Sequence, residues 1–320
     1  ISAVGYRADE AQFKKWWPAS YHLIGKDILT THTVYWPTML KAMGVPLPET
    51  VFAHGWGLIG ENKMRKSTGN VVNPIELADR YGVEPFRYFL MAEMVLGQDA
   101  SFSEEAFVRR YNTDLANDIG NLLSRTVKMI ATYAGGRIPG PGPVGAEEET
   151  LRSAVGAAVH TMEESIASMR LDLGIGAVSA AIRAANRYLE QRQPWTLGKK
   201  GATAELGTVL NSAAETLRVV SGLLFPIMPD KMTALRRTLG LGGAAPDLAD
   251  LRRWGGIEPG TAIGPMITLF PRIDSKGTVM PTAPVASAPD KPAAAPASTV
   301  APEGVVLIER ADFQKIQLRT

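Results

Sequence analysis

Gly60-Glu61-Asn62-Lys63-Met64-Arg65-Lys66-Ser67-Thr68-Gly69-Asn70 is a basic stretch with a glycine at or near each end. Glycine favours turns, so we predict a loop here rather than a regular helix or a central strand. Lys63 and Lys66 stand three residues apart, and ammonium groups held on such a loop can act as point charges on phosphate oxygens. A solvated basic turn is the ordinary alternative for so short a charge run, and the loop by itself favours that alternative. The choice depends on the residues around the loop.

Two apolar segments ahead of the loop read as strands of an α/β sheet. One covers residues 21–27 and is broken by Gly25 at its carboxyl end, after which residues 28–43 form a helical pattern; the other covers residues 51–56. Ligands bind beyond the carboxyl ends of strands in open α/β sheets. Asp27, at the strand-to-helix turn, either caps the helix or accepts a hydrogen bond from a ribose hydroxyl, and capping is the commoner use.

Ile28, His32 and Trp36 recur every four residues in the helical pattern, so we expect them on one face of the helix. An indole and an imidazole beside an aliphatic residue could line a pocket for an apolar side chain. A helix that packs its aromatic face into the core has the same spacing, and spacing alone favours that packing.

The basic stretch resembles the Lys-Met-Ser-Lys-Ser loop of class I aminoacyl-tRNA synthetases, with Arg65 at the variable middle position. The order of the motifs is similar to that of the methionyl-tRNA synthetases in particular. His22-Leu23-Ile24-Gly25-Lys26-Asp27 comes first, then His32 and Trp36, then His54-Gly55 and the lysine loop. The likeness runs from about residue 6 to residue 272.

The resemblance implies a two-step reaction, in which methionine and ATP form methionyl-adenylate and the methionyl group then passes to the 3′ end of tRNA(Met). Mg²⁺ would share the phosphate charge. Ile28, His32 and Trp36 would line the methionine pocket, and Lys63 and Lys66 would neutralise charge that builds between the α- and β-phosphates. The residues implied to bind ATP are Gly25, Asp27, His54, Lys63, Lys66 and Ser67.

From Ser103 the apolar period becomes helical, with Ser103 as the expected cap of the first helix. That helix is expected to run to Gly135-Gly136, and further helices are predicted around residues 151–166, 178–189, 206–224 and 230–239. Their apolar faces predict an antiparallel bundle.

A polar stripe of Asn117, Asn121 and Arg125 lies on the first of these helices at four-residue spacing. A solvated face is the ordinary explanation. The stripe could also present donors and acceptors to splayed bases, while Trp195, after Pro194 at a helix end, could stack on one of them. The resemblance implies that Asn117, Asn121, Arg125 and Trp195 read the CAU anticodon and that Pro194 shapes the turn. Asn186 is a weaker candidate.

The C-terminal part changes character twice. Residues 262–270 read as a closing strand, and residues 275–302 are rich in Pro, Ala, Ser and Thr, which predicts a semi-extended linker. Residues 305–316 resemble the first strand of the OB-fold module found in some of these enzymes, too few to close a barrel. The expected fold class is therefore α/β plus all-α: the C-terminal half of a Rossmann-type class I catalytic domain, an antiparallel α-helix-bundle anticodon-binding domain, a Pro/Ala linker and the start of an OB-fold module. The expected boundaries are 1–60 for the catalytic part, 61–102 for the lysine-loop and stem-contact region, 103–273 for the bundle, 274–303 for the linker and 304–320 for the module.

Composition sets outer bounds. The hydrophobic content of 45% in 320 residues suggests two or more domains, and the net charge of +2 only mildly favours a polyanionic partner. The absence of cysteine excludes disulfides and thiolate metal sites in this sequence, and we expect no metal site in it. No run is apolar enough to span a membrane, so the expected compartment is the cytoplasm.

We expect the sequence to be a fragment. It shows no match to the His-Ile-Gly-His ATP signature of the family or to the metal-bearing connective insert, so it is expected to be inactive alone and does not determine whether the whole protein binds zinc. A homodimer through a complete C-terminal module is a further expectation. Two alternatives to a methionine–tRNA ligase stay open here: another class I synthetase, such as the leucine or cysteine enzyme, and a non-catalytic tRNA-binding protein that retains the bundle.

Overall fold

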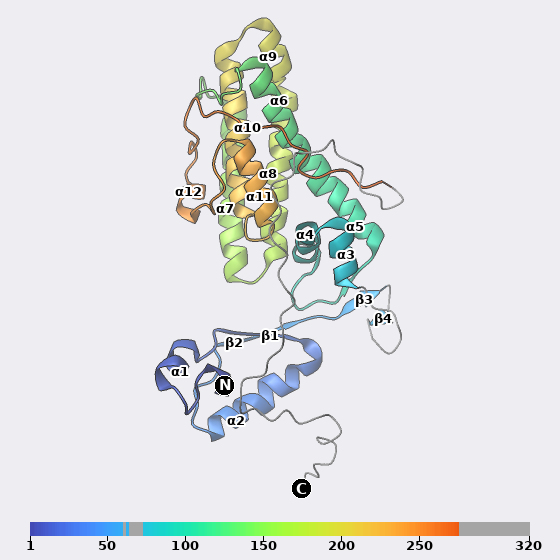
Figure 1. The fold of residues 1–320 in the computed structure, drawn as a ribbon, viewed down its shortest axis with the longest axis vertical. Helices are drawn as coiled ribbons and strands as arrows, with labels where there is room; N and C mark the ends of the chain where they lie inside the picture. The colour runs from blue at the N-terminus through green and yellow to red at the C-terminus, as the bar shows by residue number, and fades with distance from the viewer. Residues whose placement is uncertain (60–61, 64–72, 275–320) are drawn as a thin grey trace, which may run out of the picture. The chain divides into compact units, whose positions relative to one another are not determined.

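The computed structural model describes residues 1–59, 62–63 and 73–274, and its helices and strands are labelled in Figure 1. The predictions for Lys66, Ser67, the linker and the OB-fold start concern residues outside these ranges. Within them, no helix is long and apolar enough to cross a membrane.

The first part of the chain contains a pair of parallel strands, β1 (Tyr21–Gly25) and β2 (Thr50–His54). This confirms both predicted strands, with β1 ending at the glycine that was expected to break it. A 3₁₀ turn η2 (Lys26–Ile28), a π-helical turn η3 (Thr31–Tyr35) and the helix α2 (Trp36–Ala42) connect the two strands. Ahead of them lie the 3₁₀ turn η1 (Ser2–Val4) and the helix α1 (Glu10–Trp16).

A second, small sheet has the strand order β4-β3-β5. Its strands are β3 (Gly57–Ile59), β4 (Asn62–Lys63) and β5 (Ala100–Ser101). β3 pairs in parallel with β5 across a long connection that contains the helices α3 (Pro74–Tyr81) and α4 (Val83–Glu93). The expected boundary at residue 60 would group β3 with the first sheet, whereas its hydrogen bonds join it to β5. We call residues 57–101 the loop-bearing unit, because they surround the lysine loop in the sequence.

Local caps explain where several helices begin. Asn73 accepts the backbone N–H of Ile75 at 3.1 Å ahead of Pro74, whose fixed φ suits the first position of α3. Ser103 accepts the N–H of Ala106 at 3.1 Å, which confirms the predicted cap of α5 (Glu104–Arg110). Both helices therefore start at signals present in the sequence.

The remaining helices form the predicted bundle, which is drawn from green to orange in Figure 1. α5 continues without a break into the π-helix η5 (Tyr111–Gly120) and α6 (Asn121–Tyr133), so the long first helix is confirmed but its middle is π-helical. The central helix α10 is buried at every position from Leu206 to Leu223, as expected for a helix surrounded by others. The other elements are α7 (Ala146–Ala167), α8 (Leu171–Arg192), α9 (Pro194–Lys200), α10 (Thr203–Leu223), α11 (Pro229–Thr238) and α12 (Leu248–Arg252).

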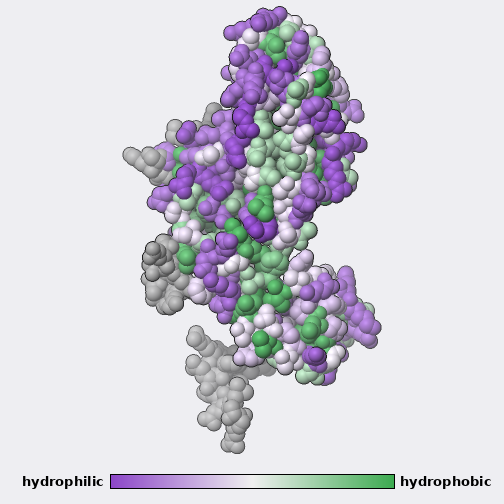
Figure 2. Space-filling model, turned by 180° about the vertical axis from the view of Figure 1, so that it is seen from behind, coloured by the Kyte–Doolittle hydropathy of each residue, from purple (hydrophilic) through white to green (hydrophobic). Residues whose placement is uncertain are grey.

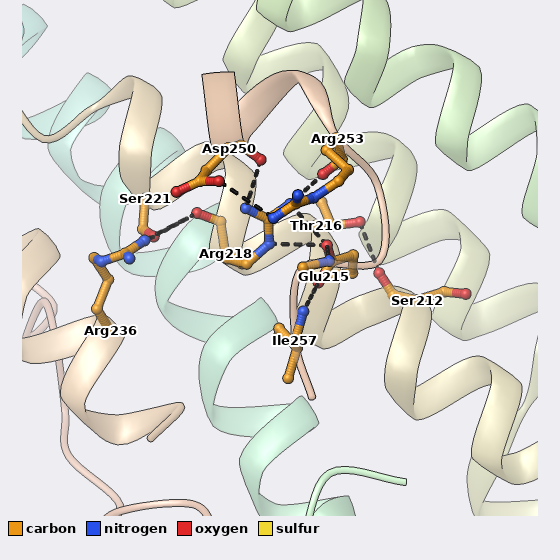
Figure 3. Close-up of polar contacts among 10 residues, drawn as sticks. Ser212, Glu215, Thr216, Arg218, Ser221, Arg236, Asp250, Arg253 and Ile257 are labelled. Carbon is orange, nitrogen blue, oxygen red and sulfur yellow. Dashed lines mark hydrogen bonds and ion pairs between the residues drawn. The ribbon is translucent and has the colours of Figure 1, made fainter. Parts of the chain in front are cut away.

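A buried polar cluster ties the segment around α12 to α10 (Figure 3). The carboxylate of Glu215, which is 0% exposed, pairs with Arg218 and accepts the backbone N–H of Gly256 at 2.6 Å. Arg218 in turn donates to the backbone carbonyls of Asp250 and Arg253. Both buried charges are thus paired and hydrogen-bonded, which is the condition for burying them without a large penalty.

The predicted closing strand at residues 262–270 is wrong. This segment is extended but forms only one isolated bridge, between Arg137 and Ala262, and the N–H of Ile263 donates to the carbonyl of Gly136 at 3.0 Å. Leu269 and Phe270 are buried in the core of the bundle. A short, nearly continuous apolar run fits either a buried strand or a segment packed on helices, and here the neighbours of Leu269 and Phe270 are the helices of the bundle.

Candidate functional site

The predicted nucleotide-binding residues converge at one edge of the parallel pair. The register places Gly25 of β1 opposite His54 of β2, both at the last position of their strands. A Cβ atom added at Gly25 would lie 2.5 Å from Oδ1 of Asp27 and 3.6 Å from Cε1 of His54. The glycine therefore permits a close approach of these two side chains at the strand ends, where a ligand is expected.

Two observations favour ligand binding at these strand ends. Nδ1 of His54 lies 2.8 Å from the carbonyl of Gly55, so Nδ1 carries the proton and Nε2 is left as an acceptor. Asp27 does not act as the predicted helix cap, because neither η2 nor η3 has a side-chain cap. The ribose alternative for Asp27 therefore stays a proposal.

An open pocket of about 560 Å³ lies between β1 and the helical segment that follows it. His32 and Trp36 line this pocket, whereas Ile28 is not among the lining residues. The π-helical turn η3 separates Ile28 from Trp36, and because a π turn contains more residues than an α turn, it rotates Ile28 out of the expected face. The lining residues are Tyr21, His22, Leu23, Ile24, Thr31, His32, Tyr35, Trp36 and Met39.

His22 is a residue that sequence reasoning quoted in a motif but did not assign to the pocket. Its Nε2 accepts the indole N–H of Trp36 at 3.1 Å, and its ring lies edge-on to His32 with centroids 6.4 Å apart. Trp17 adds a second indole, edge-on to Trp36 at 6.2 Å. The sequence held one indication of this role: a partly buried indole N–H, such as that of Trp36, needs a hydrogen-bond acceptor nearby.

Lys26, directly after β1, connects the strand that lines the pocket to the loop-bearing unit. Its ammonium group pairs with Asp99 and lies 4.1 Å from the ring centroid of Trp56. Gly55 allows this approach, because a Cβ there would lie 2.0 Å from the carbonyl oxygen of Gln98. Of the predicted catalytic lysines, Lys63 has its backbone in β4, paired with Leu58, and Lys66 lies outside the described residues together with Ser67.

The candidate anticodon-binding residues come from three elements of the bundle. Asn117 is on η5, Asn121 and Arg125 are on α6, and Trp195 is at the second position of α9. The guanidinium carbon of Arg125 lies 5.7 Å from the ring centroid of Trp195, although the two are far apart in the sequence. Trp195 is 37% exposed, so its ring remains accessible for stacking.

Buried contacts hold these residues in place. Pro194 is buried at the first position of α9, which fixes the start of the helix that carries Trp195. Asn186 of α8 donates to the carbonyl of Asp118 in η5 at 3.0 Å, so it supports the π-helix. Asn121 is exposed and Asn117 is half-buried. On the face shown in Figure 2, the end of the bundle that carries α9 is covered mostly by hydrophilic residues.

Two family models match consecutive parts of the chain. The model of class I tRNA synthetases (M) matches residues 1–127, and the model of the anticodon binding domain of methionyl tRNA ligase matches residues 138–278. The chain belongs to the methionyl-tRNA synthetase family.

Members of this family with curated names match the whole chain or most of it. The methionine–tRNA ligase of Halalkalibacterium halodurans is 38% identical over 322 residues, which cover 100% of this chain and 48% of the relative. Methionine–tRNA ligase 1 of Bacillus cereus is 42% identical over 281 residues, which cover 86% of this chain and 42% of the relative. The chain thus spans about half the length of the curated relatives it matches.

Solved methionyl-tRNA synthetase structures agree with the fold. The Mycobacterium tuberculosis enzyme in complex with methionyl-adenylate has a TM-score of 0.80 and 36% identity, covering 85% of this chain and 54% of that one. Its apo form has a TM-score of 0.78 and 34% identity over the same shares. A class I catalytic fragment followed by an anticodon-binding domain is therefore the architecture of this family member.

Proposed function

We propose that this chain supplies the C-terminal half of the catalytic domain and the anticodon-binding bundle of a methionine–tRNA ligase. The observation that carries the proposal is the pocket walled by His32 and Trp36 beside the strand ends of Gly25 and His54, in a chain of the methionyl-tRNA synthetase family. We propose the cytoplasm as its compartment.

The proposed reaction has two steps. An oxygen of the methionine carboxylate attacks the α-phosphorus of ATP, which forms methionyl-adenylate and releases pyrophosphate. The hydroxyl of the 3′-terminal ribose of tRNA(Met) then attacks the methionyl carbonyl carbon and AMP leaves. Neither step needs a protein nucleophile, so positioning and electrostatic stabilisation supply the catalysis.

The pocket suits the side chain of methionine. Its walls combine indole and imidazole rings with Leu23 and Met39, and thioethers make favourable contacts with aromatic rings. Discrimination by an apolar wall is worth only about 1–3 kcal/mol per methylene, so contacts along the whole thioether are needed. Ile28, just outside the lining, would act on methionine only after a local rearrangement.

The strand ends suit the nucleotide. Asp27 would accept from the ribose hydroxyls beside Gly25, and the Nε2 acceptor of His54 would face the base or ribose. Lys63 and Lys66 would neutralise the charge that develops between the α- and β-phosphates, with Ser67 supporting the loop.

Mg²⁺ is proposed only as a companion of ATP. Asp99, near the strand ends, is paired with Lys26 and accepts the N–H of Trp56. The ion would supply charge neutralisation on phosphate oxygens, and no step is assigned to it.

The bundle is proposed to read the CAU anticodon through Asn117, Asn121, Arg125 and Trp195. Arg125 and Trp195 lie close together, so the indole offers a stacking surface beside the guanidinium group. Two features beyond the described residues complete the proposal: a linker at 274–303 and an OB-fold start at 304–320, through whose complete form the protein would dimerise. The division near residue 102 belongs to the proposal as well, with the loop-bearing unit starting at residue 57 because β3 pairs with β5.

The test uses the 320-residue chain and two fluorescently labelled RNA stem-loops, one carrying CAU and one carrying a changed anticodon. Binding followed by anisotropy should favour CAU, and Trp195→Ala or Asn121→Ala should abolish the preference. Trp195→Ala should weaken CAU binding by about ten-fold or more, since a base–aromatic stack contributes about 1–3 kcal/mol.

Arg152→Ala is the matched control, because Arg152 is an exposed arginine on α7 that pairs with Glu149. It should weaken binding to both stem-loops equally and slightly. Equal affinity of the unmodified chain for both stem-loops would overturn the anticodon assignment.

A further inference from the structure

Helix α4 caps another helix with one of its own side chains. The two carboxylate oxygens of Glu84 accept the backbone N–H groups of Asp230 at 2.6 Å and Lys231 at 2.8 Å. These N–H groups lie in the first turn of α11 and have no partner inside their own helix. A negative charge here also meets the positive end of the α11 dipole.

One turn further along α4, Arg87 holds the chain just ahead of α11. Its Nε donates to the carbonyl of Ile227 and its Nη2 to the carbonyl of Pro226, both at 3.0 Å. α4 therefore makes hydrogen bonds on both sides of the start of α11. Glu84 accepts N–H groups of the first turn of α11, and Arg87 donates to carbonyls of the segment between α10 and α11. We call these two residues the α4 clamp.

The clamp residues bind main-chain groups, so their contacts depend on the path of the backbone. All four of its hydrogen-bond partners are main-chain groups, and charge-assisted bonds of this kind are stronger than neutral ones. Lys231 extends the contact, since its ammonium group donates to the carbonyl of Leu269 at 3.0 Å. A small rotation of α4 relative to α11 would break several of these bonds together.

The clamp joins the part of the chain that carries Lys63 to the bundle that carries the candidate anticodon-binding residues. On one side, α4 belongs to the loop-bearing unit, in which α3 begins at Pro74, shortly after the lysine loop. On the other side, the segment that Arg87 binds follows α10, and the opposite end of α10 follows α9, which carries Trp195. α10 has 21 residues, a length of about 32 Å, and is buried almost throughout, so it behaves as a rigid spacer.

We propose that the α4 clamp sets the orientation of the loop-bearing unit on the bundle, so that one tRNA molecule engages both. The inference rests on the proposed function. Glu84 and Arg87 are positioning residues that act through α11 and the turn before it. Tyr88 and Phe89 also pack α4 into the core of the bundle, and the hydroxyl of Tyr88 lies 3.0 Å from Oδ2 of Asp114. Loss of the clamp is therefore expected to let α4 tilt on this core, and the affinity for a ligand that spans both parts then falls in proportion to the population of the competent orientation. A ligand that contacts only the bundle is unaffected.

The test compares two RNAs on the 320-residue chain: an unmodified tRNA(Met) transcript and the CAU stem-loop. Glu84→Gln and Arg87→Ala should each weaken binding of the whole transcript by about ten-fold, which corresponds to a competent population of about one tenth. The stem-loop affinity should stay within about two-fold. We compare variants by the ratio of the two affinities, because a change in the net charge of the protein weakens or strengthens binding of both RNAs and largely cancels in the ratio.

Glu76→Gln is the matched control. It removes the same charge from the same unit, but within the described residues Glu76 accepts a local bond from the side chain of Asn73, at 2.7 Å, and none from α11. Its ratio should equal that of the unmodified chain. Glu84→Asp keeps the charge at the end of α11 with a shorter reach, and it should fold and give an intermediate ratio.

Amide hydrogen exchange supplies a readout inside the clamp. In Glu84→Gln the amides of Asp230 and Lys231 should exchange faster, while those in the middle of α10 should not change. An unchanged affinity ratio in both variants, alongside a CAU preference of the unmodified chain, would overturn the clamp alone. An unmodified chain that prefers no anticodon would overturn the proposed function and this inference with it.

Discussion

Trp36 donates its indole N–H to Nε2 of His22 at 3.1 Å, which joins helix α2 to strand β1 at the wall of the open pocket. The bond requires an unprotonated Nε2, so in neutral His22 the proton is on Nδ1. It therefore fixes both the tautomer of the histidine and the orientation of the indole.

Trp36→Phe should release that tautomer. Phenylalanine keeps an aromatic ring against Trp17 but has no N–H, so the Nδ1–H and Nε2–H forms of His22 should become mixed. The cost in stability should be about 1 kcal/mol, typical of one hydrogen bond. Imidazole ¹⁵N chemical shifts of the chain at pH 8 measure the tautomer. His160, exposed on α7, is the internal control, and an unchanged His22 spectrum would contradict the assigned bond.

Gly198→Ala should weaken CAU binding without touching the RNA contacts. A Cβ at this position of α9 would lie 2.6 Å from the ring of Tyr133, so either that ring or α9 must shift, and we expect a shift of α9 that carries Trp195 away from Arg125. The expected loss is about ten-fold, within the worth of one stacked base. Anisotropy with the CAU stem-loop measures it.

Gly176→Ala is the control for that variant. Gly176 lies on α8 with no atom within 4 Å of an added Cβ, so alanine should leave RNA binding unchanged and stabilise the helix by about 0.5–1 kcal/mol. Similar RNA affinities for both alanine variants would contradict the steric account.

Glu215→Gln should destabilise the bundle strongly. It would leave the buried guanidinium of Arg218 without its carboxylate and place an amide N–H₂ beside backbone donors (Figure 3), at a cost of about 3–5 kcal/mol. Urea denaturation followed by circular dichroism measures the free energy of unfolding. Glu163→Gln removes a carboxylate paired with Arg252, which is 61% exposed, and should cost less than about 1 kcal/mol. Equal effects would show that burial of the first pair does not matter.

Glu148 should make the bundle acid-sensitive. Burial by itself raises the pKa of this carboxyl, but bonds from Tyr188 and the N–H of Gly145, with the Arg192 charge, outweigh burial and hold the pKa below its ordinary value of 4.5. A lowered pKa in the folded state contributes stability that is present above the unfolded-state value and is lost as the pH falls through the folded-state value.

Glu148→Gln should therefore cost about 1–3 kcal/mol at pH 7, and this difference from the unmodified chain should shrink below pH 4.5. Urea denaturation between pH 7 and pH 3 measures it. Glu149→Gln neutralises the adjacent, exposed carboxylate and should show a small difference at pH 7. If the difference in unfolding free energy between Glu148→Gln and the unmodified chain stayed constant down to pH 3, the lowered pKa of Glu148 would be refuted.

Local signals in the sequence were sufficient for most elements. Ser103 marks a predicted helix start that the structure confirms, and Asn73-Pro74 is a second local start signal, because a cap depends on residues within one turn. The strands at β1 and β2 and the family also followed from short motifs. His32 and Trp36 were correctly expected to share a wall, although spacing alone could not separate a pocket from a packed core.

Contacts between distant residues decided the rest. The π-helical element η5 depends on how a helix meets its neighbours, such as Asn186 of α8 reaching the carbonyl of Asp118. The other π-helical turn, η3, lies between Ile28 and Trp36, and Ile28 is not among the residues that line the pocket. The segment 262–270 has the apolar content of a buried strand, but its buried residues Leu269 and Phe270 pack in the core of the helical bundle. The bond from Trp36 to His22, the approach of Arg125 to Trp195 and the α4 clamp likewise join residues that no sequence period relates. Periodicity reports which face of an element is apolar, whereas only the folded chain determines what that face meets.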